Sequence, residues 1–149
     1  MKASACRFIG AILASFVFLL PIAVPAFGAT VSWIDGSGLW SDATHWSSNP
    51  NFPGAADDVV ITDNIAGPTA TITHNTGTDT IRSINNSETV VVNGGSTLSI
   101  LLTVGSTNTG TLQAGGASAG TIALGTGAAL NNFNGTLRAD NGGLITLSN

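Results

Sequence analysis

The sequence predicts an all-β chain, folded as a parallel β-helix behind a tryptophan-rich N-terminal cap. Three observations lead to this prediction. Apolar and polar residues alternate in short segments, and Gly- and Asn-rich stretches separate those segments. Beyond the N-terminal region, no window shows an apolar stripe with the helical period of about 3.6 residues. Successive side chains of a strand point to opposite faces, so each alternating segment is expected to bury one row.

The alternation is clearest in the segment 97–104, where Leu101 is the one residue out of pattern. Leu98, Ile100, Leu102 and Val104 are expected to share one strand face. The same pattern predicts further strands around 70–72, 90–92, 112–114, 122–124, 137–139 and 145–147. Turns such as Asn93-Gly94-Gly95 separate them, because Gly and Asn tolerate the positive φ of tight turns.

A loose repeat favours the β-helix over the β-sandwich, which stays the alternative. The segments 110–114, 120–124 and 135–139 share the form Gly-Thr-apolar-x-apolar, but their starts are 10 and then 15 residues apart. After residue 59 the only aromatic residue is Phe133, whereas sandwiches usually have aromatic cores. Short strands with Leu, Ile and Val suit stacked rungs, and Thr and Asn can form hydrogen-bonded ladders between them.

The N-terminus has the order of a secretory signal peptide. Lys2 and Arg7 precede the apolar run 8–20, and small residues at Ala26 and Gly28 provide a cleavage site. We predict cleavage after Gly28, with Ala29 as the next choice. An uncleaved anchor is the competing interpretation, but the apolar run is shorter than the roughly 20 residues of a spanning helix. The predicted organisation is therefore 1–28 signal peptide, 29–58 cap and 59–149 rungs.

Loss of the signal peptide leaves a chain with few charges. Arg82 and Arg138 then stand against eight acidic residues, for a net charge of −6. This charge provides no electrostatic basis for binding nucleic acid or anionic lipid, so we predict no nucleic-acid partner and membrane contact only through the signal peptide. The one cysteine, Cys6, is removed with the signal, which excludes disulfides and thiol chemistry in the mature chain.

The tryptophans of the predicted cap allow two interpretations. Trp33, Trp40 and Trp46 could form a platform that stacks on sugar rings, with Asp42 and His45 supplying hydrogen bonds. Alternatively, the three indoles form a lid over the open N-terminal end of the β-helix. The spacings of seven and six residues fit a folded cap as well as a platform. These five residues are the candidate glycan-binding site.

Metal ligands are sparse in the sequence. Asp57 and Asp58 could bind calcium with Asp63, or they could simply begin the strand that follows, and no calcium-loop motif supports the first alternative. His45 and His74 are too few and too far apart for a zinc site, which needs three or four ligands. Neither histidine has an evident carboxylate partner in the sequence. We predict no metal and no cofactor.

Catalytic motifs are also missing. The sequence has no G-x-S-x-G elbow, no H-E-x-x-H and no phosphate-binding loop. Asp79, Glu88 and Asp140 lie on different predicted turns, so no pair of carboxylates is expected across a cleft. We predict a protein without catalytic residues. A threonine row over 69–73 raises the third possibility of a water-ordering surface, although one row is not an array.

Two motifs carry a resemblance to a known group of proteins. The segment 33–46 reads W-x-x-G-x-G-x-W-S-D-A-T-H-W, and the segment 53–61 reads P-G-A-A-D-D-V-V-I. Together they resemble the N-terminal part of large bacterial exported β-helix proteins, of the autotransporter-passenger, adhesin-like or PEP-CTERM-sorted type. The resemblance is close from Trp33 to about Val104. It implies a β-helix displayed at the cell surface or released.

The sequence departs from that group at its end. It stops at Asn149 within a predicted strand, without a membrane barrel or a C-terminal sorting helix. A solenoid needs a terminal cap, so we expect either a fragment of a longer chain or an open rung that self-associates. The expected function is that of an exported adhesin-like interaction protein that contacts glycans or host and cell-surface components. The alternative is a fragment of a carbohydrate-binding or carbohydrate-active β-helix protein.

Overall fold

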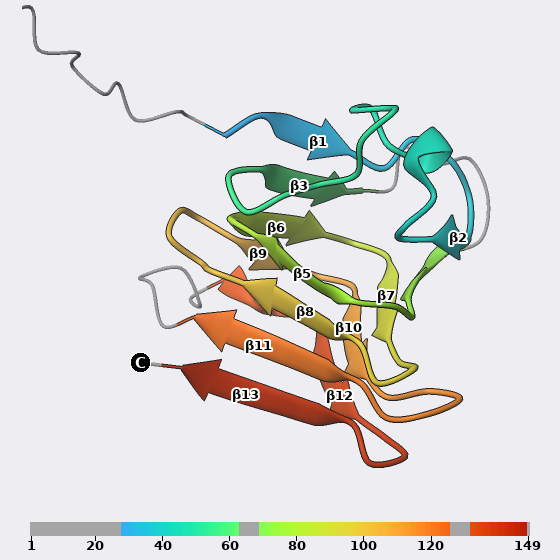
Figure 1. Ribbon diagram of the computed structural model, residues 1–149. Coiled ribbons are helices and arrows are strands. Elements are labelled where there is room, and N and C mark those ends of the chain that lie inside the picture. Colours follow the sequence, from blue (N-terminus) through green and yellow to red (C-terminus); the bar gives the residue numbers. More distant parts are fainter. Residues whose placement is uncertain (1–27, 63–68, 126–131, 149) are drawn as a thin grey trace, which may run out of the picture.

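The computed structural model describes residues 28–62, 69–125 and 132–148, and it confirms the all-β parallel solenoid (Figure 1). The predicted signal peptide therefore lies outside the described residues, apart from Gly28. Every ladder between named strands in the described part is parallel, which excludes the antiparallel β-sandwich.

The strands form three sheets that run along the solenoid. The first sheet contains β1 (Thr30–Ser32), β3 (Asp58–Ile61), β6 (Ser83–Asn86) and β9 (Thr107–Asn108). The second contains β2 (Gly38–Leu39), β4 (Thr71–His74), β7 (Thr89–Val92), β10 (Thr111–Ala114) and β12 (Thr136–Ala139). The third contains β5 (Thr78–Ile81), β8 (Thr97–Ile100), β11 (Thr121–Gly125) and β13 (Leu144–Ser148).

Each turn of the chain adds one strand to each sheet. The triplets β3–β4–β5, β6–β7–β8 and β9–β10–β11 follow one another along the axis, and β12 and β13 continue the stack (Figure 1). This winding explains the uneven repeat in the sequence. The repeats at Thr111 and Thr121 lie in one turn of the solenoid, on two different sheets, and are closely spaced in sequence. The repeat at Thr136 lies in the next turn, where Thr136 pairs with Thr111, so the step from Thr121 to Thr136 is longer.

The core consists of apolar columns inside the three sheets. Ile72, Val90 and Leu112 stack on one another in the second sheet, and all three are buried. Comparable columns fill the first and third sheets, and each buried Leu, Ile or Val contributes on the order of 1.5–3 kcal/mol. The predicted alternation thus buries the expected rows in the interior turns.

Ladders of polar residues also link the turns, as predicted. The side-chain amide of Asn86 donates to Asn108 Oδ1 at 2.8 Å, and both residues are fully buried. The same amide donates to the carbonyl of Glu88 at 2.9 Å, so it also fixes the corner after β6. On the outer surface of the second sheet, four threonines stand in register: Thr71, Thr89, Thr111 and Thr136.

The glycine that opens each repeat has a packing role. A Cβ atom at Gly110 would lie 2.1 Å from the carbonyl oxygen of Glu88, and one at Gly135 would lie 2.2 Å from the carbonyl oxygen of Gly110. Contacts this short are impossible for a side chain. Glycine therefore allows each turn to approach the preceding turn just before β10 and β12.

The predicted strand over 97–104 is wrong in its second half. β8 ends at Ile100, and Leu102 has a φ of 55°, a conformation that few residues other than Gly and Asn adopt. Leu102 is buried at this corner, whereas Val104 is exposed. The left-handed residue of this corner is a leucine, and the glycine of the connection, Gly105, comes later, so neither Gly nor Asn marks where the strand ends.

The two ends of the solenoid differ. β1 and β2 pair with β3 and β4, so the predicted cap region supplies strands as well as a lid. At the opposite end, β12 and β13 are edge strands, and Leu137, Leu144 and Leu147 are exposed. Leu137 and Ala139 of β12, which the alternation predicts to be buried, are therefore exposed, because no described strand packs beyond β12.

Candidate functional site

The three tryptophans of the predicted cap form a buried cluster above the first turn. Trp46 packs edge-on against both Trp33 and Trp40, with ring centroids 4.8 Å apart in each pair. The indole N–H of Trp46 donates to the carbonyl of Trp40 at 2.8 Å, and that of Trp33 donates to the carbonyl of Gly36 at 2.7 Å. All three side chains are buried. The lid interpretation of the cap is confirmed.

A short helical turn places the other two candidate residues. Asp42 caps the 3₁₀ turn η1 (Ala43–His45). Its carboxylate accepts hydrogen bonds from the backbone N–H of Thr44 at 3.0 Å and from the hydroxyl of Thr44 at 2.6 Å. These bonds from Thr44 hold the pKa of Asp42 below its ordinary value. The turn orients His45 toward Trp33 and then directs Trp46 into the core.

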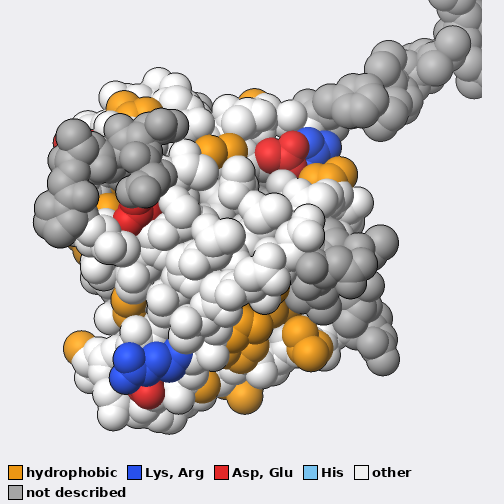
Figure 2. Space-filling view, turned by 180° about the vertical axis from the view of Figure 1, so that it is seen from behind, with side chains coloured by type: hydrophobic (Ala, Val, Ile, Leu, Met, Phe, Trp, Pro, Cys, Tyr) orange, Lys and Arg blue, Asp and Glu red, His pale blue; other side chains and the backbone are white. Residues whose placement is uncertain are grey.

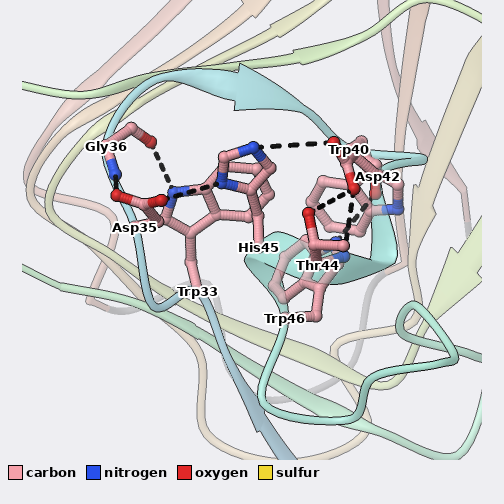
Figure 3. Close-up of polar contacts among 8 residues, drawn as sticks. All are labelled: Trp33, Asp35, Gly36, Trp40, Asp42, Thr44, His45 and Trp46. Carbon is pink, nitrogen blue, oxygen red and sulfur yellow. Dashed lines mark hydrogen bonds and ion pairs between the residues drawn. The ribbon is translucent and has the colours of Figure 1, made fainter.

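His45 lies at the surface of the lid between two carboxylates (Figure 3). Its ring stacks on Trp33, with centroids 4.9 Å apart and planes 7° from parallel. Nδ1 is 3.7 Å from Asp35 Oδ2, and Nε2 is 3.7 Å from Asp42 Oδ2. His45 therefore has carboxylate partners that were not evident in the sequence, and Asp35 is a further residue of this site.

The structure brings all five candidate residues together, but it divides them by exposure. The indoles of Trp33, Trp40 and Trp46 face the interior, so they present no open aromatic surface in this conformation. Asp42 and His45, with the strongly exposed Asp35, form the polar rim of the lid. This rim can accept and donate hydrogen bonds to a polar ligand.

A second polar chain lies inside the solenoid. His74 Nε2 is 2.9 Å from Asp79 Oδ2, and Nδ1 is 2.8 Å from the hydroxyl of Ser96. His74 thus also has a carboxylate partner that was not evident in the sequence. The two residues are five positions apart, and the corner between β4 and β5 brings them together.

The residue types Ser, His and Asp suggest nucleophilic catalysis, but the geometry points to a structural role. Ser96 lies 2.6 Å from the carbonyl oxygen of Asn93 and 2.9 Å from that of His74. Because a hydroxyl has one proton, these contacts engage it with the backbone rather than with the imidazole. Ser96 and His74 are buried, and no pocket opens in the described residues. This row of hydrogen-bonded side chains joins two successive turns of the solenoid.

The paired aspartates at the start of β3 also have protein partners. Asp58 forms an ion pair with Arg82 and accepts the hydroxyl of Ser83 at 2.5 Å. Hydrogen bonding from Arg82 lowers the pKa of Asp58 and raises that of Arg82. Asp57 accepts the amides of Gly54 and Ala29. The third proposed calcium ligand, Asp63, lies outside the described residues.

The other acidic residues are separated as well. Glu88 is buried and accepts the amide of Ala70 at 2.6 Å, whereas Asp140 accepts the side-chain amide of Gln113 at 3.2 Å. Asp79 lies in β5 rather than on a turn. Within residues 28–62, 69–125 and 132–148, no three His, Cys, Asp or Glu side chains are grouped so that they could hold a metal ion.

Comparison with known protein families, characterised proteins and solved structures gives no match for this chain. Among the described residues, no helix has the length and apolar character needed to cross a membrane.

Proposed function

We propose that this protein is an exported adhesin-like scaffold, displayed at a bacterial cell surface or released from it. In this proposal the chain is the N-terminal part of a β-helix passenger that has no catalytic residues of its own. It acts by presenting its outer faces to glycans or to host and cell-surface components. The proposal rests on the signal-like N-terminus and on the parallel solenoid that follows it.

The observation that carries the proposal is the nature of the outer faces. Besides the threonine column of the second sheet, the third sheet aligns Thr78, Thr97 and Thr121 on adjacent strands. Charged side chains are few and scattered over the face seen in Figure 2, and apolar ones gather toward its lower end. Flat rows of hydroxyl groups suit weak, repeated hydrogen bonding to extended polar surfaces.

Adhesion is tested by coating beads with the purified protein and measuring their retention on glycan arrays and on intact cells. We expect retention to fall when the column is charged in the double variant Thr89→Glu/Thr111→Glu. The matched control is Asn85→Glu/Thr107→Glu, which places the same charges on the first sheet. Equal retention for all three proteins, or no retention of any, contradicts the adhesin proposal.

Carbohydrate recognition by the lid is the second candidate, favoured by the polar rim of Asp35, Asp42 and His45. Binding on a glycan array that is lost in His45→Ala, while circular dichroism and unfolding stay unchanged, supports a sugar site at the rim. Trp40→Ala separates the roles further. Loss of the fold in Trp40→Ala supports a purely structural lid, whereas loss of binding alone supports sugar recognition.

We also propose that copies of this chain associate with one another through the C-terminal turn. Edge strands expose unpaired backbone groups, and β13 also presents Leu144 and Leu147 to solvent. The concentration dependence of the mass in solution tests this interaction.

A further inference from the structure

We infer that export cuts the chain between Gly28 and Ala29, and that the new amino group of Ala29 binds the carboxylate of Asp57. This inference rests on the proposed export. It adds, to the cleavage site predicted from the sequence, an ion pair that only the processed chain can form.

The carboxylate of Asp57 is already held in position for this amino group. Ala29 N lies 3.2 Å from Asp57 Oδ1. Gly54 N–H donates to the other oxygen, Oδ2, at 2.9 Å, and Asp57 N–H donates back to the carbonyl of Gly54 at 2.9 Å. This turn fixes the carboxylate with one oxygen toward Ala29. Cleavage replaces the amide by an ammonium group at the same place.

The contacts of Ala29 also distinguish the two cleavage sites that the sequence permits. The carbonyl of Ala29 accepts the N–H of Asp58 at 2.8 Å, directly before the register Thr30↔Asp58 that joins β1 to β3. A cut after Ala29 would remove this bond together with the contact to Asp57. A cut after Gly28 keeps both. The hydrogen bond from Asp58 to the carbonyl of Ala29 therefore survives only a cut before Ala29.

The chemistry of the step is hydrolysis by a signal peptidase. Water adds to the carbonyl carbon of Gly28, the C–N bond to Ala29 breaks, and the amine leaves with a proton. An α-amino group has an ordinary pKa of about 7.7–8.0, and a carboxylate in contact favours its charged form. The pair lies at the surface, so its effect on the amine is expected to be modest.

The composition makes this amino group easy to observe. Lys2 is the only lysine of the chain and is removed with the signal peptide. The α-amino group of Ala29 is then the only primary amine of the mature protein. An amine-reactive acylating reagent therefore reports on this group alone, and an uncut chain differs because it keeps both the Met1 amino group and Lys2.

The experiment expresses the whole chain in a bacterial host and isolates the product from the periplasm and the medium. Intact mass and N-terminal sequencing are expected to show a chain that starts at Ala29. Retention of the full-length chain in the cytoplasm would overturn the export proposal. An exported product that starts elsewhere would leave export intact and overturn the cleavage inference.

The ion pair is tested by acylation rates near neutral pH on the processed protein. Because the ammonium form does not react, we expect Asp57→Asn to react about two- to fivefold faster than the wild type. The exposed Asp35→Asn serves as the matched control and is expected to react at the wild-type rate. Wild-type protein in urea should show the same acceleration, which keeps the test valid if Asp57→Asn does not fold. Equal rates for native and unfolded wild type would overturn the pairing.

Discussion

Replacement of Trp46 is the sharpest test of the lid, because this indole is 0% exposed and contacts both other tryptophans. Trp46→Ala removes a large buried side chain, a change that typically costs about 3–5 kcal/mol. Trp46→Phe keeps an aromatic ring but leaves the carbonyl of Trp40 without the indole donor, which costs about 1–3 kcal/mol. We therefore expect a graded loss, larger for alanine than for phenylalanine.

The assay is urea unfolding followed by far-ultraviolet circular dichroism, which reports on the strands rather than on the altered fluorophore. Phe52→Ala is the matched control, because Phe52 is an aromatic residue of the same region with an exposed side chain. It is expected to change the free energy of unfolding by less than about 0.5 kcal/mol. A Trp46→Ala protein as stable as the control would refute a lid built on buried indoles.

Three further predictions follow from the turns below the lid. Asn86→Ala should lower the free energy of unfolding by about 1–3 kcal/mol in urea titrations, because it leaves the buried side-chain oxygen of Asn108 without its donor, whereas the exposed Asn85→Ala should change it little. Arg82 lowers the pKa of Asp58, so the stability from this pair is present above the ordinary carboxyl pKa and is lost as pH falls through the lowered value. Thermal unfolding across the acid range should show this loss, and a wild-type slope in Asp58→Asn would argue against it. Leu147→Lys should reduce self-association measured by sedimentation, and an unchanged mass would remove the C-terminal turn as the contact.

Much of the fold follows from local sequence. The Gly-Thr-apolar repeat predicts β10, β11 and β12, because glycine is needed where turns approach closely and alternation directs Leu112 and Ile122 inward. The corner at Leu102 could not be predicted, since a leucine occupies the left-handed conformation there. Packing of the surrounding turns overrides its backbone preference.

The residues of the candidate site could be predicted from the sequence, but their arrangement in space could not. Tryptophan spacing identifies the lid residues, but spacing alone does not tell a buried cluster from an open platform. The partners Asp35 and Asp79 were not predicted, because each contact depends on how the local chain bends rather than on sequence spacing. The corner between β4 and β5 brings Asp79 to His74, and the fold of the cap brings Asp35 to the stacked ring of His45.

The parallel winding is the central claim, and the threonine column of the second sheet tests it directly. With threonine methyl groups labelled, nuclear Overhauser spectra should connect Thr71 to Thr89, Thr89 to Thr111, and Thr111 to Thr136, since neighbouring strands lie about 4.7–4.9 Å apart. This chain of contacts joins residues far apart in sequence in one order only. Its presence would establish the register of the solenoid, and contacts typical of antiparallel hairpins would contradict it.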